Sequence, residues 1–163
     1  MATFVLVHGA WHGGWCWRDV RAILEGSGHA VFTPTMTGVG ERSHLIDAMT
    51  DIGVHIADIV NLIEWEELTD VVLVGHSYGG MVITGVADAV KDRLRHVVYL
   101  DAFLPEDGDS SASLAVRLMN PAATDEDYTL EIARRTALAT DTGGVPPDLE
   151  RLFDIPPEPA AAY

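Results

Sequence analysis

Cysteine and basic residues are scarce in this chain of 163 residues, and each scarcity excludes a class of protein. The single cysteine, Cys16, excludes an intramolecular disulfide framework and suits a reducing compartment. Because it lies between Trp15 and Trp17, we interpret it as a small buried hydrophobe. The 10 Lys and Arg against 25 Asp and Glu give a formal net charge of −15, which disfavours nucleic acid and anionic membrane surfaces as partners.

Long hydrophobic runs are also missing. No apolar stretch approaches the ~18 residues of a membrane span, and no charged segment precedes an apolar one at the start of the sequence. We therefore expect neither a membrane partner nor a signal peptide, and a cytoplasmic location. The length is enough for one sizeable core, since a chain of this size buries about 70% of its unfolded surface.

The most informative stretch is residues 70–82. An apolar run at 71–74 has the pattern of a strand buried on both faces of a parallel sheet, and it leads directly into Gly75-His76-Ser77-Tyr78-Gly79 and a helix-compatible segment. This is the G-x-S-x-G pattern of a nucleophile elbow. The glycines allow a tight turn that would hold Ser77 in a strained conformation. The alternative is a glycine-rich turn in any doubly wound protein.

Periodicity along the first hundred residues predicts alternating strands and helices. One helical stripe contains Val20, Ile23 and Leu24, and a second contains Ile52, Ile56, Ile59, Val60 and Ile63, with Asp58 on its polar face. Residues 37–44 are too rich in turn formers for regular structure. The order predicts an α/β fold, a parallel sheet with helices on both faces. The predicted strands are 3–7, 29–33, 71–74 and 97–100, and the predicted helices are 17–25, 52–66 and 78–91.

The composition changes after Pro105, where acidic residues and most of the eight prolines gather. We therefore divide the chain into an α/β core at 1–105 and a helical lid at 106–163. Helices are predicted at 114–119 and 128–138, and loops at 143–147 and 156–159. The alternative for this region is an acidic, partly disordered tail.

A serine hydroxyl needs a base to take its proton and donors for the oxyanion that forms. The backbone N–H of Tyr78 is one expected donor, and the loop after the first strand, at Gly9 and Ala10, offers a second. His8 and His12 precede the nucleophile, so we interpret both as braces of that loop. The residues expected to line the substrate site are Gly9, Trp11, His12, His76, Phe103 and Leu104.

The base is harder to assign. In this architecture the histidine follows the nucleophile, and of seven histidines only His96 does so. His96 opens the fourth predicted strand, so it should lie at the opposite edge of the sheet from Ser77, a strand's length away. Asp101 ends that strand beside the elbow. There it could orient a histidine as the acid of a triad, or it could simply cap the following turn.

Three segments carry a shared pattern: Phe4 to Trp15, Gly75 to Met81 and Tyr99 to Pro105. Together they closely resemble the α/β-hydrolase superfamily. Within it the likeness is to bacterial carboxylesterases, pyrethroid-hydrolase-like enzymes included, that are similar to plant methylsalicylate esterases and hydroxynitrile lyases. The resemblance implies a cofactor-free, metal-free serine hydrolase with Ser77 as nucleophile and the N–H groups of Ala10 and Tyr78 as oxyanion hole. The lyases carry threonine at the position of Gly9, which favours an esterase.

Members of this branch continue with two further strands that supply an acid and the triad histidine, and no counterpart follows residue 105. We expect part of a longer protein from which these carboxyl-terminal strands are missing; the alternative is a degenerate copy. The leading hypothesis is hydrolysis of small, largely apolar carboxylic esters. The alternatives are a non-catalytic small-ligand binder without the base and a lyase on the same scaffold. An exposed fourth strand would favour self-association, so a homodimer is a possible assembly.

Overall fold

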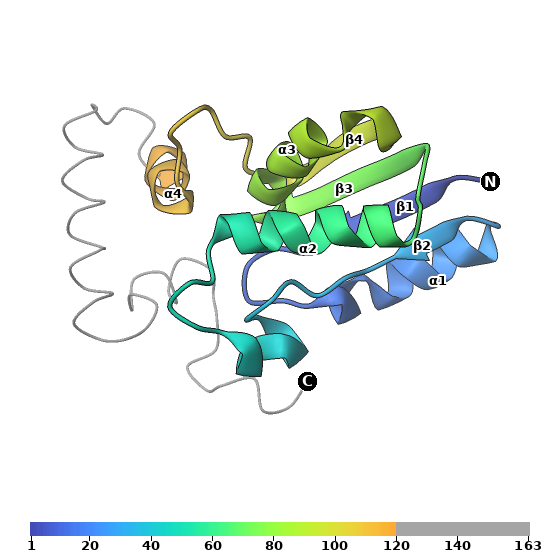
Figure 1. Cartoon of the computed structure of the whole chain (residues 1–163), viewed down its shortest axis with the longest axis horizontal. Helices are drawn as coiled ribbons and strands as arrows, with labels where there is room; N and C mark the ends of the chain where they lie inside the picture. The colour runs from blue at the N-terminus through green and yellow to red at the C-terminus, as the bar shows by residue number, and fades with distance from the viewer. Residues whose placement is uncertain (120–163) are drawn as a thin grey trace. The chain divides into compact units, whose positions relative to one another are not determined.

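The computed structural model describes residues 1–119 (Figure 1). Its contacts divide the chain after Gly108 into two units, each described by itself. The first unit alternates strands and helices as the sequence predicts, and the second contributes one described helix. The elements are β1 (Thr3–Val7), α1 (Arg18–Gly26), β2 (Ala30–Phe32), α2 (Ile52–Trp65), β3 (Val71–Ser77), α3 (Gly79–Ala89), β4 (Leu94–Ala102) and α4 (Ser111–Met119), with short 3-10 helices at Gly14–Trp17, Gly40–Leu45 and Lys91–Arg93.

The four strands form one sheet in the order β2-β1-β3-β4, and every pairing in it is parallel. The predicted α/β class is therefore confirmed. Parallel strands bring their carboxyl ends to one edge of the sheet, here called the carboxyl edge. Val7 pairs with Gly75, and Ser77 pairs with Ala102, so the loops after β1, β3 and β4 all leave from this edge.

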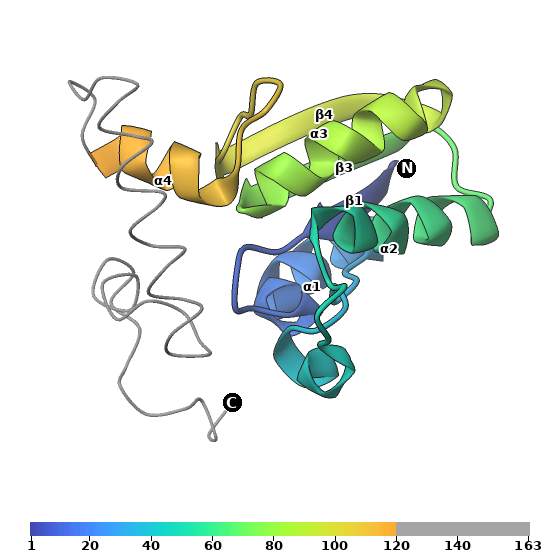
Figure 2. The ribbon, with the colours of Figure 1, turned by 60° about the vertical axis from the view of Figure 1, so that its left-hand side comes forward.

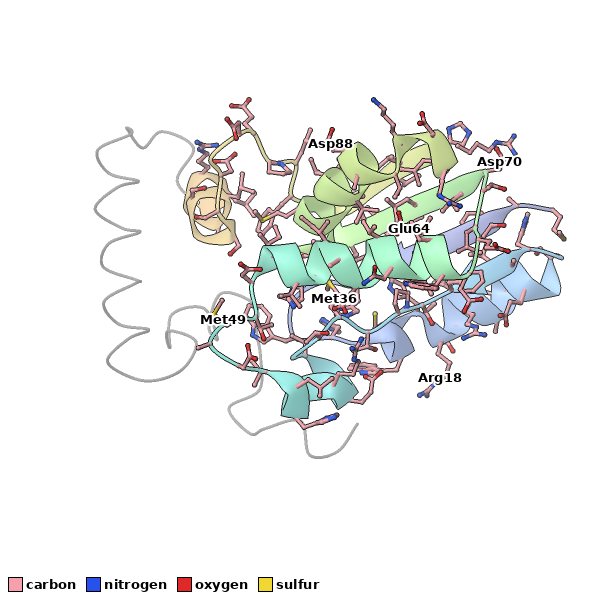
Figure 3. All side chains as sticks on the ribbon, viewed as in Figure 1. Arg18, Met36, Met49, Glu64, Asp70 and Asp88 are labelled. Atoms are coloured by element: carbon pink, nitrogen blue, oxygen red, sulfur yellow. The ribbon has the colours of Figure 1, made fainter. Side chains whose placement is uncertain are left out.

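The larger part of the core lies between the sheet and the helices α2 and α3, which run side by side (Figure 1). Met36 from the loop after β2 is 1% exposed and joins this cluster beside α2 (Figure 3). The β-branched residues of the strands pack here because strands buried on both faces carry continuous apolar runs. The cluster members that β1, β3 and α3 contribute include Val5, Val7, Val71, Leu73, Val82, Ile83 and Val86.

The other face of the sheet carries a smaller cluster, in which Trp17 packs with Leu6, Val31 and Val74. Helix α1 is on the side of this smaller cluster and does not join the pair formed by α2 and α3 (Figure 2). The stripe predicted for α1 is largely wrong as a buried face, because Val20 and Ile23 are exposed and only Leu24 packs against the cluster. Cys16 is exposed, so its interpretation as a buried residue is also wrong.

Helix α2 differs from its prediction by a small rotation about its axis. Its buried residues are His55, Ile59 and Ile63, whereas Ile52 is exposed. Asp58 is not on a solvated face, because its carboxylate accepts hydrogen bonds from the loop after β2. The spacing of isoleucines thus identified the helix, and a histidine and a carboxylate took places on its inner side because they have hydrogen-bond partners there.

Two further predictions change at their boundaries. The stretch expected to lack regular structure contains the 3-10 helix Gly40–Leu45, and β4 runs from Leu94 to Ala102, longer than the predicted strand at 97–100. In the second unit, Ser110 and Ser113 cap α4 reciprocally, each hydroxyl accepting the other's backbone N–H. The predicted helix at 128–138 and the loops at 143–147 and 156–159 lie outside the described residues. Within the described part of the chain, no helix combines the length and hydropathy that a membrane span needs.

Candidate active site

Ser77 lies at the turn between β3 and α3. It is the last residue of β3, its φ is 52°, and α3 begins at Gly79 with Tyr78 as the N-cap. A φ in this region is strained for a residue with a side chain. The turn needs its glycines: a Cβ on Gly75 would lie 2.6 Å from the Gly79 oxygen, and one on Gly79 would lie 2.8 Å from the Val7 and His8 oxygens. The strand-to-helix turn predicted from the spacing is present.

The loop after β4 braces the same turn. The backbone N–H of Phe103 donates to the Ser77 carbonyl oxygen at 3.0 Å. A Cβ on Gly80 would lie 2.1 Å from the Phe103 oxygen and 2.8 Å from the Ala102 Cβ. Gly80 is thus a third glycine that the turn requires, and the G-x-S-x-G pattern does not include it.

The loop after β1 comes against the nucleophile. A Cβ on Gly9 would lie 3.2 Å from the Ser77 Cβ and 3.1 Å from His76 Nδ1, so glycine permits the close approach. Ala10 follows, and then Trp11 with φ 61°, a conformation that bulky residues rarely adopt. The structure therefore brings Gly9 to Ser77 and fixes the backbone that carries the Ala10 N–H.

His8 is fully buried and braces this loop from below. The Met36 N–H donates to His8 Nε2 at 3.1 Å, so Nδ1 carries the proton and donates to the Gly9 carbonyl oxygen at 2.7 Å. Burial lowers the pKa of His8 below its usual value of 6.5, which keeps the ring neutral in this tautomer. His12 is exposed, and its Nδ1 lies 2.8 Å from the Ala10 carbonyl oxygen. Both contacts agree with the interpretation of these histidines as braces.

Asp101 is the extra residue of a β-bulge. His76 pairs with Leu100 and Ser77 pairs with Ala102, which leaves Asp101 unpaired between them, exposed and with φ 44°. The carboxylate is therefore next to the elbow in register. This position suits either of the two interpretations, orientation of a histidine or a turn at the strand end.

His96 lies at the other edge of the sheet, as expected. It pairs with Val72 near the start of β3, five residues before Ser77, and is exposed. At ~3.3 Å per residue this separates His96 from the nucleophile by roughly 16 Å along the strands. Direct proton transfer between the two side chains is excluded at that separation.

A hydrogen-bond chain that the sequence did not predict holds Tyr78 from behind. His55 Nε2 lies 2.8 Å from the Thr37 carbonyl oxygen, so it must donate, and Nδ1 then accepts from the Tyr78 hydroxyl at 2.8 Å. The two rings meet edge to face, and burial raises the pKa of Tyr78 to about 12. The sequence feature that could have indicated these hydrogen bonds is a histidine among the buried apolar residues of α2.

Thr37 is itself fixed by charged groups. Its N–H donates to Asp58 at 2.6 Å and its hydroxyl to the other oxygen of the same carboxylate at 3.0 Å. The Arg42 guanidinium donates to the Thr37 hydroxyl at 3.1 Å and to the Thr35 carbonyl oxygen at 2.7 Å. The Thr35 hydroxyl donates to Glu41 and lowers the pKa of that carboxylate. The loop after β2 is thus a polar support for the residues around Ser77.

The remaining predicted site residues lie in β3 and in the segments that follow β1 and β4 at the carboxyl edge. His76 is partly buried and meets Trp17 edge to face, with ring centroids 6.2 Å apart. Trp11 is 41% exposed and Leu104 is 66% exposed, while Phe103 is partly buried. Within residues 1–119 no three His, Cys, Asp or Glu side chains are grouped to hold a metal ion.

Comparison with known proteins agrees with this geometry. The model of the Alpha/beta hydrolase family matches residues 4–163. The chain belongs to the α/β-hydrolase family. A carbendazim hydrolyzing esterase of Nocardioides sp. (strain SG-4G) is 60% identical over 121 residues, which are 74% of this chain and 50% of that protein. An alpha-hydroxynitrile lyase of Arabidopsis thaliana is 34% identical over 104 residues, 63% of this chain and 40% of the lyase.

A solved structure gives the same result for this α/β hydrolase. An extracellular α/β-hydrolase from a Paenibacillus species, which shares structural and functional homology with tobacco salicylic acid binding protein 2, superposes with a TM-score of 0.68 at 30% identity. It covers 88% of this chain and 53% of the solved one. The chain thus spans about half the length of the relatives it matches.

Proposed function

We propose that this α/β hydrolase is a serine esterase of small, largely apolar carboxylic esters, with Ser77 as nucleophile. The Ser77 hydroxyl attacks the ester carbonyl carbon and loses its proton to a base, which would pass that proton to the departing alcohol. The tetrahedral oxyanion then collapses to an acyl-serine as the alcohol leaves, and water releases the acid and restores the hydroxyl. The backbone N–H groups of Ala10 and Tyr78 would hold the oxyanion, each contributing on the order of 3 kcal/mol.

One observation carries the proposal above the others. A non-glycine residue at the strand-to-helix turn has φ 52°, and the loop after β1 comes within contact of it. A strained serine at the carboxyl edge, beside a loop that can supply a second N–H, is the arrangement that acyl transfer needs. The exposed side chains of Trp11 and Leu104 at the same edge support an apolar acyl or alcohol group. The similarity to a carbendazim esterase supports hydrolysis over other chemistries.

The test is covalent labelling of the chain with a fluorophosphonate, followed by assays with p-nitrophenyl acetate and carbendazim. We expect the label on Ser77 and its loss in Ser77→Ala. The matched control is Ser43→Ala, because Ser43 is an exposed serine in the 3-10 helix Gly40–Leu45. Labelling that survives in Ser77→Ala would overturn the assignment of the nucleophile.

A second candidate is a small-molecule binder that uses the same site without turnover. The observation behind it is the position of His96, which pairs with Val72 at the far edge of the sheet and cannot be the base. If no base reaches Ser77, the serine would depend on the oxyanion donors, which still leave about 10³ to 10⁴ over water. Saturable binding of a p-nitrophenyl ester with no label on Ser77 would favour the binder.

A further inference from the structure

We propose that His55 is a positioning residue, which holds Tyr78 through its side-chain hydroxyl and so fixes the backbone N–H of Tyr78 next to Ser77. The proposal rests on the proposed function, because that N–H is the expected oxyanion donor. It concerns a residue of α2 that is distant in sequence from the elbow and carries no part of the G-x-S-x-G pattern.

The direction of each hydrogen bond is determined by the atoms involved. The Thr37 oxygen is a carbonyl and can only accept, so His55 Nε2 bears the proton. Nδ1 of the neutral ring is then an acceptor, and the Tyr78 hydroxyl must donate to it. The ring thus links the backbone of the loop after β2 to the side chain of the residue after the nucleophile. No other arrangement of protons on a neutral ring satisfies both 2.8 Å contacts.

The support behind His55 is rigid. Both donors of Thr37, its N–H and its hydroxyl, are used by the Asp58 carboxylate, and Asp58 lies on the same helix as His55, three residues further on. Helix α2 therefore holds Thr37 at two points, through Asp58 at its N–H and hydroxyl and through His55 at its carbonyl oxygen. A loop held in this way can fix the imidazole plane, and the imidazole fixes the phenol.

The consequence for catalysis follows from the position of Tyr78. It is the N-cap of α3, between strained Ser77 and Gly79, and its carbonyl oxygen accepts from the Met81 N–H at 3.0 Å. The hydrogen bond to His55 adds a side-chain contact to this backbone. Its N-cap position carries no side-chain hydrogen bond to the helix. A displacement of about 1 Å at such a donor can cost on the order of 10²-fold in rate, whereas the affinity for the ground state changes less.

The experiment compares two tyrosine variants. Tyr78→Phe removes the hydroxyl that donates a hydrogen bond to His55. Tyr99→Phe is the control, because it also removes a partly buried tyrosine hydrogen bond, the 2.8 Å contact between the Tyr99 hydroxyl on β4 and Thr84 on α3. We expect Tyr78→Phe to lower kcat for p-nitrophenyl acetate and the fluorophosphonate labelling rate about tenfold, with KM within about twofold. Tyr99→Phe should change each less than twofold. The midpoint temperature of thermal unfolding should fall to a similar extent in both variants.

A double-mutant cycle tests whether the two residues act together. If His55 acts only through Tyr78, His55→Gln combined with Tyr78→Phe should be no slower than the slower single variant. The proposal would be overturned if the rate loss of the double variant equalled the product of the two single losses. It would also be overturned if Tyr78→Phe reacted as fast as the wild type.

A second measurement decides the matter if the wild-type chain is not labelled, in which case the proposed function fails. In ¹⁵N relaxation-dispersion NMR, the amide of residue 78 should occupy a single state in the wild type and in Tyr99→Phe, and should show exchange in Tyr78→Phe and His55→Gln. An amide that is equally ordered in all four proteins would show that His55 does not position it.

Discussion

The close approach of the loop after β4 to α3 gives a prediction that separates backbone packing from helix propensity. Three of the glycines in the α-helices differ in what a Cβ would meet. At Gly80 it would lie 2.1 Å from the Phe103 backbone oxygen; at Gly85 it would lie 2.3 Å from Cδ1 of Ile56; at Gly26 nothing lies within 4 Å. Alanine substitution at each position adds the same methyl group.

The expected magnitudes follow from these neighbours. Alanine is better than glycine in a helix by up to about 1 kcal/mol, and at Gly26 that gain should be realised in part, since the residue ends α1. At Gly85 the end of the Ile56 side chain can rotate away, so gain and repacking should nearly cancel. At Gly80 the obstacle is backbone, and overpacking of this kind costs about 1–3 kcal/mol, so we expect Gly80→Ala to be destabilised by about 2 kcal/mol.

Urea unfolding followed by circular dichroism measures all three variants. Gly80→Ala should also react more slowly with a fluorophosphonate, because moving Phe103 disturbs the N–H that binds the Ser77 carbonyl oxygen. Equal stability of Gly80→Ala and Gly26→Ala would refute the placement of the loop after β4 against α3.

Three further predictions concern the same edge of the sheet. Gly9→Ala should lower the labelling rate of Ser77 about tenfold, because the new Cβ would lie 3.1 Å from His76 and 3.2 Å from Ser77. The free energy of unfolding should fall by less than about 1 kcal/mol, and an unchanged labelling rate would contradict the close approach. Because burial lowers the folded-state pKa of His8, the unfolded chain binds more protons below about pH 6.5. Urea unfolding should therefore show stability lost as the pH falls from 6.5 through the folded pKa, less steeply in His8→Asn; equal pH dependence in the two proteins would count against a buried neutral ring. Because the pKa of Tyr78 is raised to about 12 in the folded protein, the free energy of unfolding should fall as the pH rises above about 10. A near-ultraviolet titration should show one tyrosine that ionises at higher pH than the others, and this step should be missing in Tyr78→Phe.

The strands and the nucleophile turn could be predicted because their signals are local. The apolar run of β1 and the glycines around Ser77 each specify a backbone conformation within a few residues, and the structure has both. The spacing of Val20 and Ile23 in α1 is local too, but it says only that two residues share a face. Whether another element covers that face depends on the rest of the fold, and in the described residues both side chains are exposed.

The polar support behind the elbow could not be predicted for the opposite reason. Four residues of this support come from a loop and from α2 and the start of α3, and they meet only because the crossovers between parallel strands bring these segments to the same edge. They are Thr37, His55, Asp58 and Tyr78. Nothing in the spacing of 37, 55 and 78 marks them as neighbours. A buried histidine must still find partners, so its place among the isoleucines of α2 is the feature that sequence reasoning could have used.

The distribution of backbone strain gives a last argument for where the chemistry lies. Among the described residues other than glycine, positive φ occurs at Trp11 after β1, at Ser77, which ends β3, and at Asp101 near the end of β4. It also occurs at Glu67 and Asp70 in the turn before β3. Each costs about 1–3 kcal/mol and persists only where surrounding contacts determine it. A turn between a helix and a strand needs such residues for its path, and Asp tolerates them. The sheet itself does not need a strained tryptophan after β1 or a strained serine at the end of β3, so the strain at the carboxyl edge supports the oxyanion site proposed there.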